Sequence, residues 1–231
     1  MLKQFMGEYD LFDQNFCCKY CIWNSCILFQ VFHFKHFWLQ KYSFYFILVQ
    51  KLVSLKGSSH AVKRRKLPKY LKQECSADFK VEVDGVPGRE LQQEIIEQIH
   101  QDAKLEPSSY QVVLLGGNNI RNGKEPVSSL ILKCHDLCNR FIGLSSKLIL
   151  CGMIPSRVIS SNAIFQHADE KLKVLADEFS NVTFLNLAPH FMNAEGIDKT
   201  LYSDKTHLKK RGSRILACAI FNHISSLEMG T

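Results

Sequence analysis

In the middle of the chain an apolar run stops at two glycines and two asparagines: Val112-Val113-Leu114-Leu115-Gly116-Gly117-Asn118-Asn119-Ile120-Arg121-Asn122-Gly123. The apolar part is typical of a buried strand in a parallel sheet, and the glycines allow a sharp backbone turn after it. Open α/β sheets bind ligands beyond the carboxyl ends of their strands, so we expect the asparagine amides near a ligand site. A polar turn that merely closes a strand is the alternative at this point.

Strand and helix patterns alternate on both sides of this stretch. We expect strands at 44–55, 79–84, 110–115, 147–152 and 182–187, and helices at 61–73, 90–102, 127–142, 162–179 and 208–225. A long loop is expected over 188–203. This alternation predicts an α/β fold with three layers, built on a doubly wound, five-stranded parallel sheet with right-handed crossovers.

The amino-terminal part differs from the rest. The 231 residues suffice for one α/β domain with an appendage. We expect residues 44–231 to form the domain, and 1–43 to be an aromatic and cysteine-rich segment that is poorly ordered or not part of the native protein. Polar residues interrupt its best apolar window, so we do not expect a membrane partner. No signal-peptide pattern is present, which predicts an intracellular, cytoplasmic protein.

Charge and cysteine content exclude some classes of function. The formal net charge of +7 is mild and does not by itself require a nucleic-acid partner. The nine cysteines are odd in number and irregularly spaced, unlike a disulfide framework. Cys151 and Cys218 fit small core positions. Cys134, His135 and Cys138 share a helix but lack an evident fourth ligand, so we expect no metal and no cofactor.

Polar residues follow the predicted strands at four places. Ser58 and Ser59 follow the first strand, Gly88 lies in the turn after the second, and Asn118 follows the third. Asp204-Lys205-Thr206-His207 stands at the mouth of the last helix, where residues three apart can share a face. Each feature also has an ordinary explanation: a serine or aspartate helix cap, a tight turn, or an exposed histidine.

The joint order of these residues resembles the SGNH (GDSL-type) hydrolases. Gly57-Ser58-Ser59 is similar to the family's Gly-Asp-Ser block, with serine in place of aspartate. Gly88 matches the glycine of the second block. Gly116-Gly117-Asn118-Asn119 matches Gly-x-Asn-Asp with asparagine in the last place, and Asp204 with His207 matches Asp-x-x-His. The resemblance covers about residues 50–225 and implies the flavodoxin-like fold of that family.

The resemblance implies a serine esterase. Ser59 would be the nucleophile, His207 the general base, and Asp204 the residue that orients His207. The oxyanion hole would comprise the backbone N–H groups of Ser59 and Gly88 and the side-chain amide of Asn118. Ser58 is the alternative nucleophile. The expected substrate is a small ester, an acyl lipid or an acetylated sugar, and the loop 188–203 is expected to form part of the pocket wall.

A weakly active or inactive domain of the same fold is the second hypothesis. Basic residues at 63–66, with Lys69 and Lys72, predict a basic helix, and 209–211 form a second cluster. Such a module would bind phosphate or RNA, or derive from a mobile element. Charge runs are usually solvated helix faces, so nucleic acid is not the favoured partner.

Overall fold

The computed structural model describes residues 51–58, 67–74, 79–107 and 109–229. Five parallel strands form its main sheet in the order β2-β1-β3-β4-β5. They are β1 (Lys51–Gly57), β2 (Phe79–Gly85), β3 (Tyr110–Leu114), β4 (Lys147–Cys151) and β5 (Val182–Leu185). The predicted five-stranded, doubly wound α/β fold is therefore confirmed.

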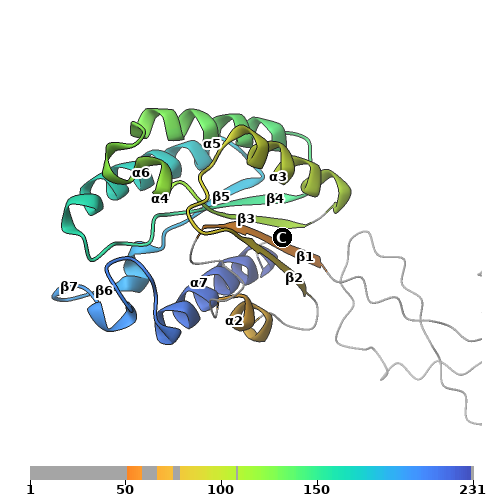
Figure 1. Cartoon of the computed structure of the whole chain (residues 1–231). Helices are drawn as coiled ribbons and strands as arrows, with labels where there is room; N and C mark the ends of the chain where they lie inside the picture. The colour runs from red at the N-terminus through yellow and green to blue at the C-terminus, as the bar shows by residue number, and fades with distance from the viewer. Residues whose placement is uncertain (1–50, 59–66, 75–78, 108, 230–231) are drawn as a thin grey trace, which may run out of the picture. The chain divides into compact units, whose positions relative to one another are not determined.

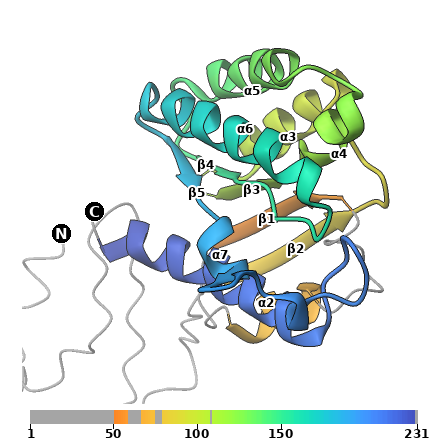
Figure 2. The same cartoon turned by 90° about the vertical axis from the view of Figure 1, so that its left-hand side faces the viewer.

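Helices cover both faces of the sheet (Figures 1 and 2). One face carries α3 (Gln93–Leu105), α5 (Val127–Phe141) and α6 (Ile159–Asp177), and the other carries α2 (Leu67–Glu74) and α7 (Lys210–Met229). Two apolar clusters result, one on each side of the sheet. All five residues of β3 are buried because this strand lies at the centre of the sheet.

The observed elements correct several predicted boundaries. Residues 44–50 and 61–66, expected in the first strand and first helix, lie outside the described residues, as does 1–43. The last helix begins at Lys210 and ends at Met229, later than expected at both ends. Pro68 is the second residue of α2, a place where its missing N–H is tolerated.

Two segments expected to be irregular have regular structure. The turn after β3 is a short helix, α4 (Gly117–Ile120), followed by the 3₁₀ turn η1 (Arg121–Gly123). The expected loop 188–203 contains η2 (Ala188–Phe191), the antiparallel pair β6 (Met192–Asn193) and β7 (Gly196–Ile197), and η3 (Lys199–Leu201). The pattern of such short elements is too brief for periodicity to predict.

Gly116 is required at the junction of β3 and α4. Its φ is 102°, in the left-handed region, and a Cβ there would lie 2.9 Å from the Met153 side chain. Glycine alone combines this backbone angle with such close packing. The sharp turn starts α4 directly beyond the strand and puts Asn118 at the carboxyl edge of the sheet.

Candidate active site

Asp204 and His207 form a hydrogen-bonded pair on the loop before α7. The Nδ1 atom of His207 lies 2.7 Å from the Oδ2 atom of Asp204. The other carboxylate oxygen, Oδ1, accepts bonds from the backbone N–H groups of Thr206 and His207, each at 2.8 Å. The carboxylate therefore both closes its own turn and orients the imidazole ring.

The Asp204–His207 pair forms through a different local structure from the helical turn that was expected. Asp204 and His207 precede the first residue of α7, so they do not share a helical turn. An Asx-type turn brings them together instead. Partial burial raises the pKa of Asp204, but hydrogen bonds from the backbone of Thr206 and His207 and from the His207 ring outweigh it, and the pKa lies below its usual range.

Asn118 is held by the loop that follows β2. Its Nδ2 atom donates to the backbone oxygen of Arg89 at 3.0 Å. A carboxamide nitrogen has two hydrogens, and no acceptor among the described residues takes the second one. The side chain is half-buried and fixed in direction, with one donor left for a ligand.

Gly88 presents a backbone donor in the same loop. Its φ is 72°, and a Cβ built on it would meet no atom within 4 Å. Glycine is needed here for the backbone angle, since L side chains rarely adopt it. Within the described part of the chain its N–H donates to no acceptor. Gly88 and Asn118 thus offer two donors linked through Arg89.

Asn119 is a structural residue rather than a ligand group. It is fully buried, and its amide pairs with the backbone of Leu91 in both directions: Oδ1 accepts from N–H at 2.9 Å and Nδ2 donates to the carbonyl at 3.1 Å. Nδ2 also donates to Glu125 at 3.0 Å. An ionised aspartate could not donate to either oxygen, so asparagine is the residue that this environment requires.

A buried charge network supports the Gly88 loop, and the sequence analysis missed it. Lys56 in β1 has only 7% of its side chain exposed and pairs with Asp102 at 2.8 Å and Asp84 at 3.6 Å. Arg89 also pairs with Asp84, at 2.8 Å. The Arg89 hydrogen bond, ahead of the Lys56 charge, holds the pKa of Asp84 below its usual value despite partial burial. The sequence signal that could have indicated this network is a lysine within an otherwise apolar strand, since a buried lysine needs an anionic partner.

The serine block is described only in part. β1 ends at Gly57, which is in register with Gly85 on one side and Leu114 on the other. Ser58 follows and is half-buried. Ser59, the expected nucleophile, lies outside the described residues, so its assignment stays a prediction. The described parts of the expected site, Gly88, Asn118, Asp204 and His207, all follow carboxyl ends of the parallel strands.

A cavity of about 500 Å³ lies between the start of α6 and the segments after β4 and β5. Its wall includes Met153, Pro155 and Phe165, together with Pro189 and Met192 from the 188–203 segment. Ala188 and Ile197 of the same segment also line the cavity, so the expected wall role applies to these four residues. Phe191 is fully buried in the core on the α7 side instead.

Asp169 is an unexpected carboxyl group in the wall of this cavity. Its Oδ1 atom accepts a hydrogen bond from the backbone N–H of Met153 at 2.8 Å. Burial raises the pKa of Asp169 to about 7, although this hydrogen bond opposes the rise. A Cβ on Gly116 would lie 2.9 Å from the Met153 side chain, so Asp169 holds a residue that packs closely against the turn before Asn118.

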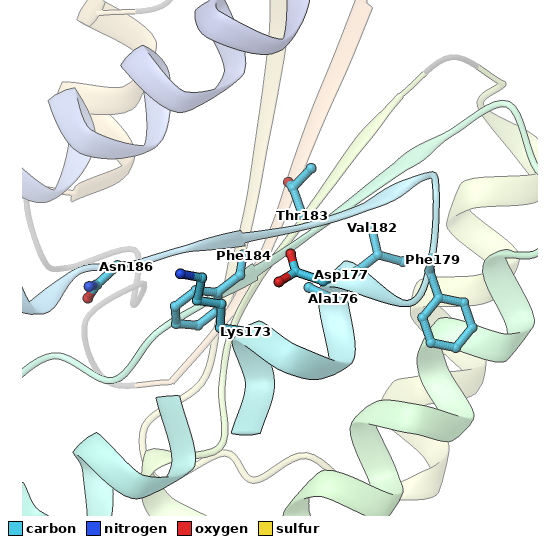
Figure 3. Close-up of a pocket in the computed structure, with 8 residues that line it drawn as sticks. All are labelled: Lys173, Ala176, Asp177, Phe179, Val182, Thr183, Phe184 and Asn186. Carbon is cyan, nitrogen blue, oxygen red and sulfur yellow. The ribbon is translucent and has the colours of Figure 1, made fainter. Parts of the chain in front are cut away.

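A second hollow lies along the outer strand β5 (Figure 3). Its volume is about 450 Å³, and it shares Lys173, Phe184 and Asn186 with the first. In the close-up these three side chains lie at one end and Phe179 lies at the other. None of the expected site residues lines it, so we assign it no role in catalysis.

The described cysteines fit core packing rather than metal binding. Cys134, Cys138 and Cys151 are buried free thiols, and Cys218 is half-buried. Burial raises the pKa of the Cys138 thiol to about 12. Within the described ranges, no group of three or more potential ligands is placed to hold a metal ion. No helix in the described part of the chain is both long and apolar enough to cross a membrane.

The similarity between this chain and known proteins is a similarity of fold. No protein-family model matches this chain, and no curated protein matches it. A member of the lipolytic protein G-D-S-L family from Veillonella parvula superposes with a TM-score of 0.64 at 15% identity, covering 76% of this chain and 98% of that one. A GDSL-like lipase from Bacteroides thetaiotaomicron gives 0.62 at 16% identity, covering 77% and 89%.

An aryl esterase from M. smegmatis is similar to the same extent. Its TM-score is 0.59 at 17% identity, and the match covers 77% of this chain and 99% of the esterase. At such identities the likeness concerns the backbone alone. The chain has the α/β fold of the solved GDSL-type (SGNH) lipolytic proteins and esterases.

Proposed function

We propose that this protein is a serine esterase of the SGNH type. The observation that carries the proposal is the Asp204–His207 pair, with Nδ1 and Oδ2 2.7 Å apart, on the segment that follows the last strand of this fold. Asn118 and Gly88 supply donors after β3 and β2, the two strands that flank β1, as the resemblance of the sequence blocks implies. The nucleophile in this proposal is Ser59, with Ser58 as the alternative.

The proposed reaction has two halves. The Ser59 hydroxyl oxygen attacks the ester carbonyl carbon while Nε2 of His207 takes its proton, and Asp204 accepts from Nδ1 to stabilise the imidazolium. The carbonyl oxygen becomes an oxyanion that accepts from the Ser59 and Gly88 N–H groups and the Asn118 amide. His207 then protonates the departing alcohol. Water, activated by the same imidazole, releases the acid and restores Ser59.

Activity-based labelling tests this proposal directly. We expect the wild-type protein to hydrolyse p-nitrophenyl acetate and to react with a fluorophosphonate probe. Ser59→Ala abolishes both, because no nucleophile remains to attack carbon or phosphorus. Ser58→Ala is the matched control and retains both. Labelling that persists in Ser59→Ala and disappears in Ser58→Ala would move the nucleophile to Ser58, and no labelling of the wild type would reject the esterase.

Phosphate or RNA binding is the second candidate function. α2, which carries Lys69 and Lys72, packs against α7, which carries Lys210 and Arg211. All four side chains belong to exposed residues, so these described members of the two basic clusters lie on neighbouring helices. Retention on an RNA column that weakens steeply with salt, together with absent probe labelling, would favour this function over the esterase.

A further inference from the structure

Arg121 is a half-buried cation on the segment that follows the proposed oxyanion donor Asn118. It follows Asn118 by three residues, across the α4–η1 turn. Residues three apart on a helical turn lie on the same face, with Cβ atoms about 5–6 Å apart. The Arg121 side chain therefore starts from the same side of the turn as the Asn118 amide.

Arg121 has no anionic partner within the described part of the chain. Its Nε atom is buried without a hydrogen bond, and no carboxylate of the described residues lies within ion-pair distance of its guanidinium. Arg89 and Arg140, with 15% and 26% of their side chains exposed, both have carboxylate partners. Burial lowers the pKa of Arg121 and nothing opposes this effect. Burying part of a cation without an anionic partner costs free energy, so a bound anion would stabilise this arginine.

An aromatic ring connects Arg121 to the cavity. The guanidinium carbon lies 5.9 Å from the centre of the Phe165 ring, a cation–π distance. Phe165 is buried in α6 and also lines the 500 Å³ cavity with Met153. The same ring would lie 3.9 Å from a Cβ on Gly117, the residue before Asn118. Phe165 thus gives the guanidinium a cation–π contact but no hydrogen-bond acceptor for its N–H groups.

We propose that Arg121 binds an anionic group, a carboxylate or a phosphate, carried by the ester substrate. This inference rests on the proposed esterase function and gives its substrate class: an ester with a negative charge on the acyl or alcohol part. A guanidinium matches both anions because its fork of N–H donors can bind two oxygens at once. Arg121 is a specificity residue in this proposal, since it contacts the substrate away from the reacting carbonyl.

Matched neutral and anionic esters test the proposal. The substrates are p-nitrophenyl butyrate, p-nitrophenyl hemiadipate and p-nitrophenyl hemipimelate, which share a leaving group and differ in terminal charge and chain length. For at least one anionic ester, Arg121→Gln should lower the ratio of its kcat/KM to that of the butyrate by about 10- to 100-fold, the effect of losing a charge-assisted bond. The change should appear mainly in KM, and Arg121→Lys should restore part of it.

Arg214→Gln is the control, because Arg214 is an exposed arginine on α7 that pairs with Glu74. It should leave the ratio unchanged. Circular dichroism melting confirms that each variant is folded. An unchanged ratio in folded Arg121→Gln for both chain lengths would overturn the proposal, whatever the absolute rates are.

Direct binding separates this inference from the esterase proposal. Isothermal titration with succinate and with inorganic phosphate needs no turnover, and its two arms distinguish a carboxylate from a phosphate preference. We expect wild-type binding of one anion that is lost in Arg121→Gln, even if fluorophosphonate labelling fails. Equal binding by the wild type and Arg121→Gln would reject the anion site while leaving a positive labelling result intact.

Discussion

Asn118 and Asn119 form long-range side-chain hydrogen bonds, whereas the Asp204 carboxylate forms its hydrogen bonds within its own exposed turn. Asn119 is fully buried, while 52% of the Asp204 side chain and 30% of the His207 side chain are exposed. The asparagines bind backbone atoms 28 and 29 residues away, and Asp204 binds groups two and three residues away. The donor half of the site thus depends on the packed fold. In the acid–base half the Asp204–His207 pairing depends on local chain geometry, and the Lys205 carbonyl between them accepts from Arg157 and Ser156 after β4.

The comparison implies that substitutions in the exposed half change chemistry without changing stability. His207→Gln should lower kcat for p-nitrophenyl acetate about 10⁴-fold, because no group remains to take the serine proton. Its midpoint in urea should stay near the wild-type value. His190→Gln is the control, an exposed histidine of η2 outside the proposed site. A fall in kcat of less than about tenfold would show that His207 is not the base.

Asn118 lies between the two kinds of residue, because it binds both the protein and the proposed oxyanion. Asn118→Ala should reduce kcat about 10²–10³-fold with little change in KM, since the lost donor acts in the transition state. Steady-state kinetics provide the measurement. Asn139→Ala, at an exposed position of α5, should retain wild-type rates. A change confined to KM would contradict the oxyanion role.

Asn119→Asp should destabilise the fold by about 1–3 kcal/mol, since the Leu91 carbonyl loses its buried donor and the new carboxylate faces Glu125. Equilibrium urea unfolding at neutral pH measures this loss. Asn139→Asp makes the same chemical change at an exposed site and should cost little. Wild-type stability in Asn119→Asp would show that the hydrogen bonds of the Asn119 amide do not stabilise the fold.

Asp169 should make the stability of the folded protein depend on pH. Its folded-state pKa of about 7 lies above the ordinary value of 3.8, so the unfolded chain loses the proton first. Stability should therefore fall as pH rises from about 4 to 7 and then level off.

Asp169→Asn keeps an oxygen for the Met153 N–H and removes the titration. The variant should gain up to about 4 kcal/mol relative to the wild type between pH 4 and pH 7, from a pKa rise of roughly three units. Urea midpoints measured across the range test the effect, and Asp177→Asn, at an exposed position of α6, should show no such trend. Parallel pH profiles for Asp169→Asn and the wild type would refute the role of Asp169.

The positions of the donor residues could be predicted from sequence, but the hydrogen-bond partners of the residues around them could not. The order of strands and turns placed Gly88 and Asn118 at one edge of the sheet, since parallel strands end together. Nothing near Asn119 in the sequence indicates that its amide pairs with Leu91, because that contact depends on how the loop after β2 packs over α4. The Lys56 network was missed for the same reason: its partners come from β2 and α3.

The sequence by itself determined the α/β alternation and the Asp204–His207 spacing, because periodicity and short turns are local properties. It could not reveal that an Asx turn, rather than a helical face, joins that pair. Only the tertiary structure decided that Asn119 is buried and hydrogen-bonded to Leu91. It also decided that Arg121 forms a cation–π contact with Phe165 and has no carboxylate partner among the described residues. Both outcomes arise from contacts between segments far apart in sequence, which only the packing of the sheet and its helices brings together.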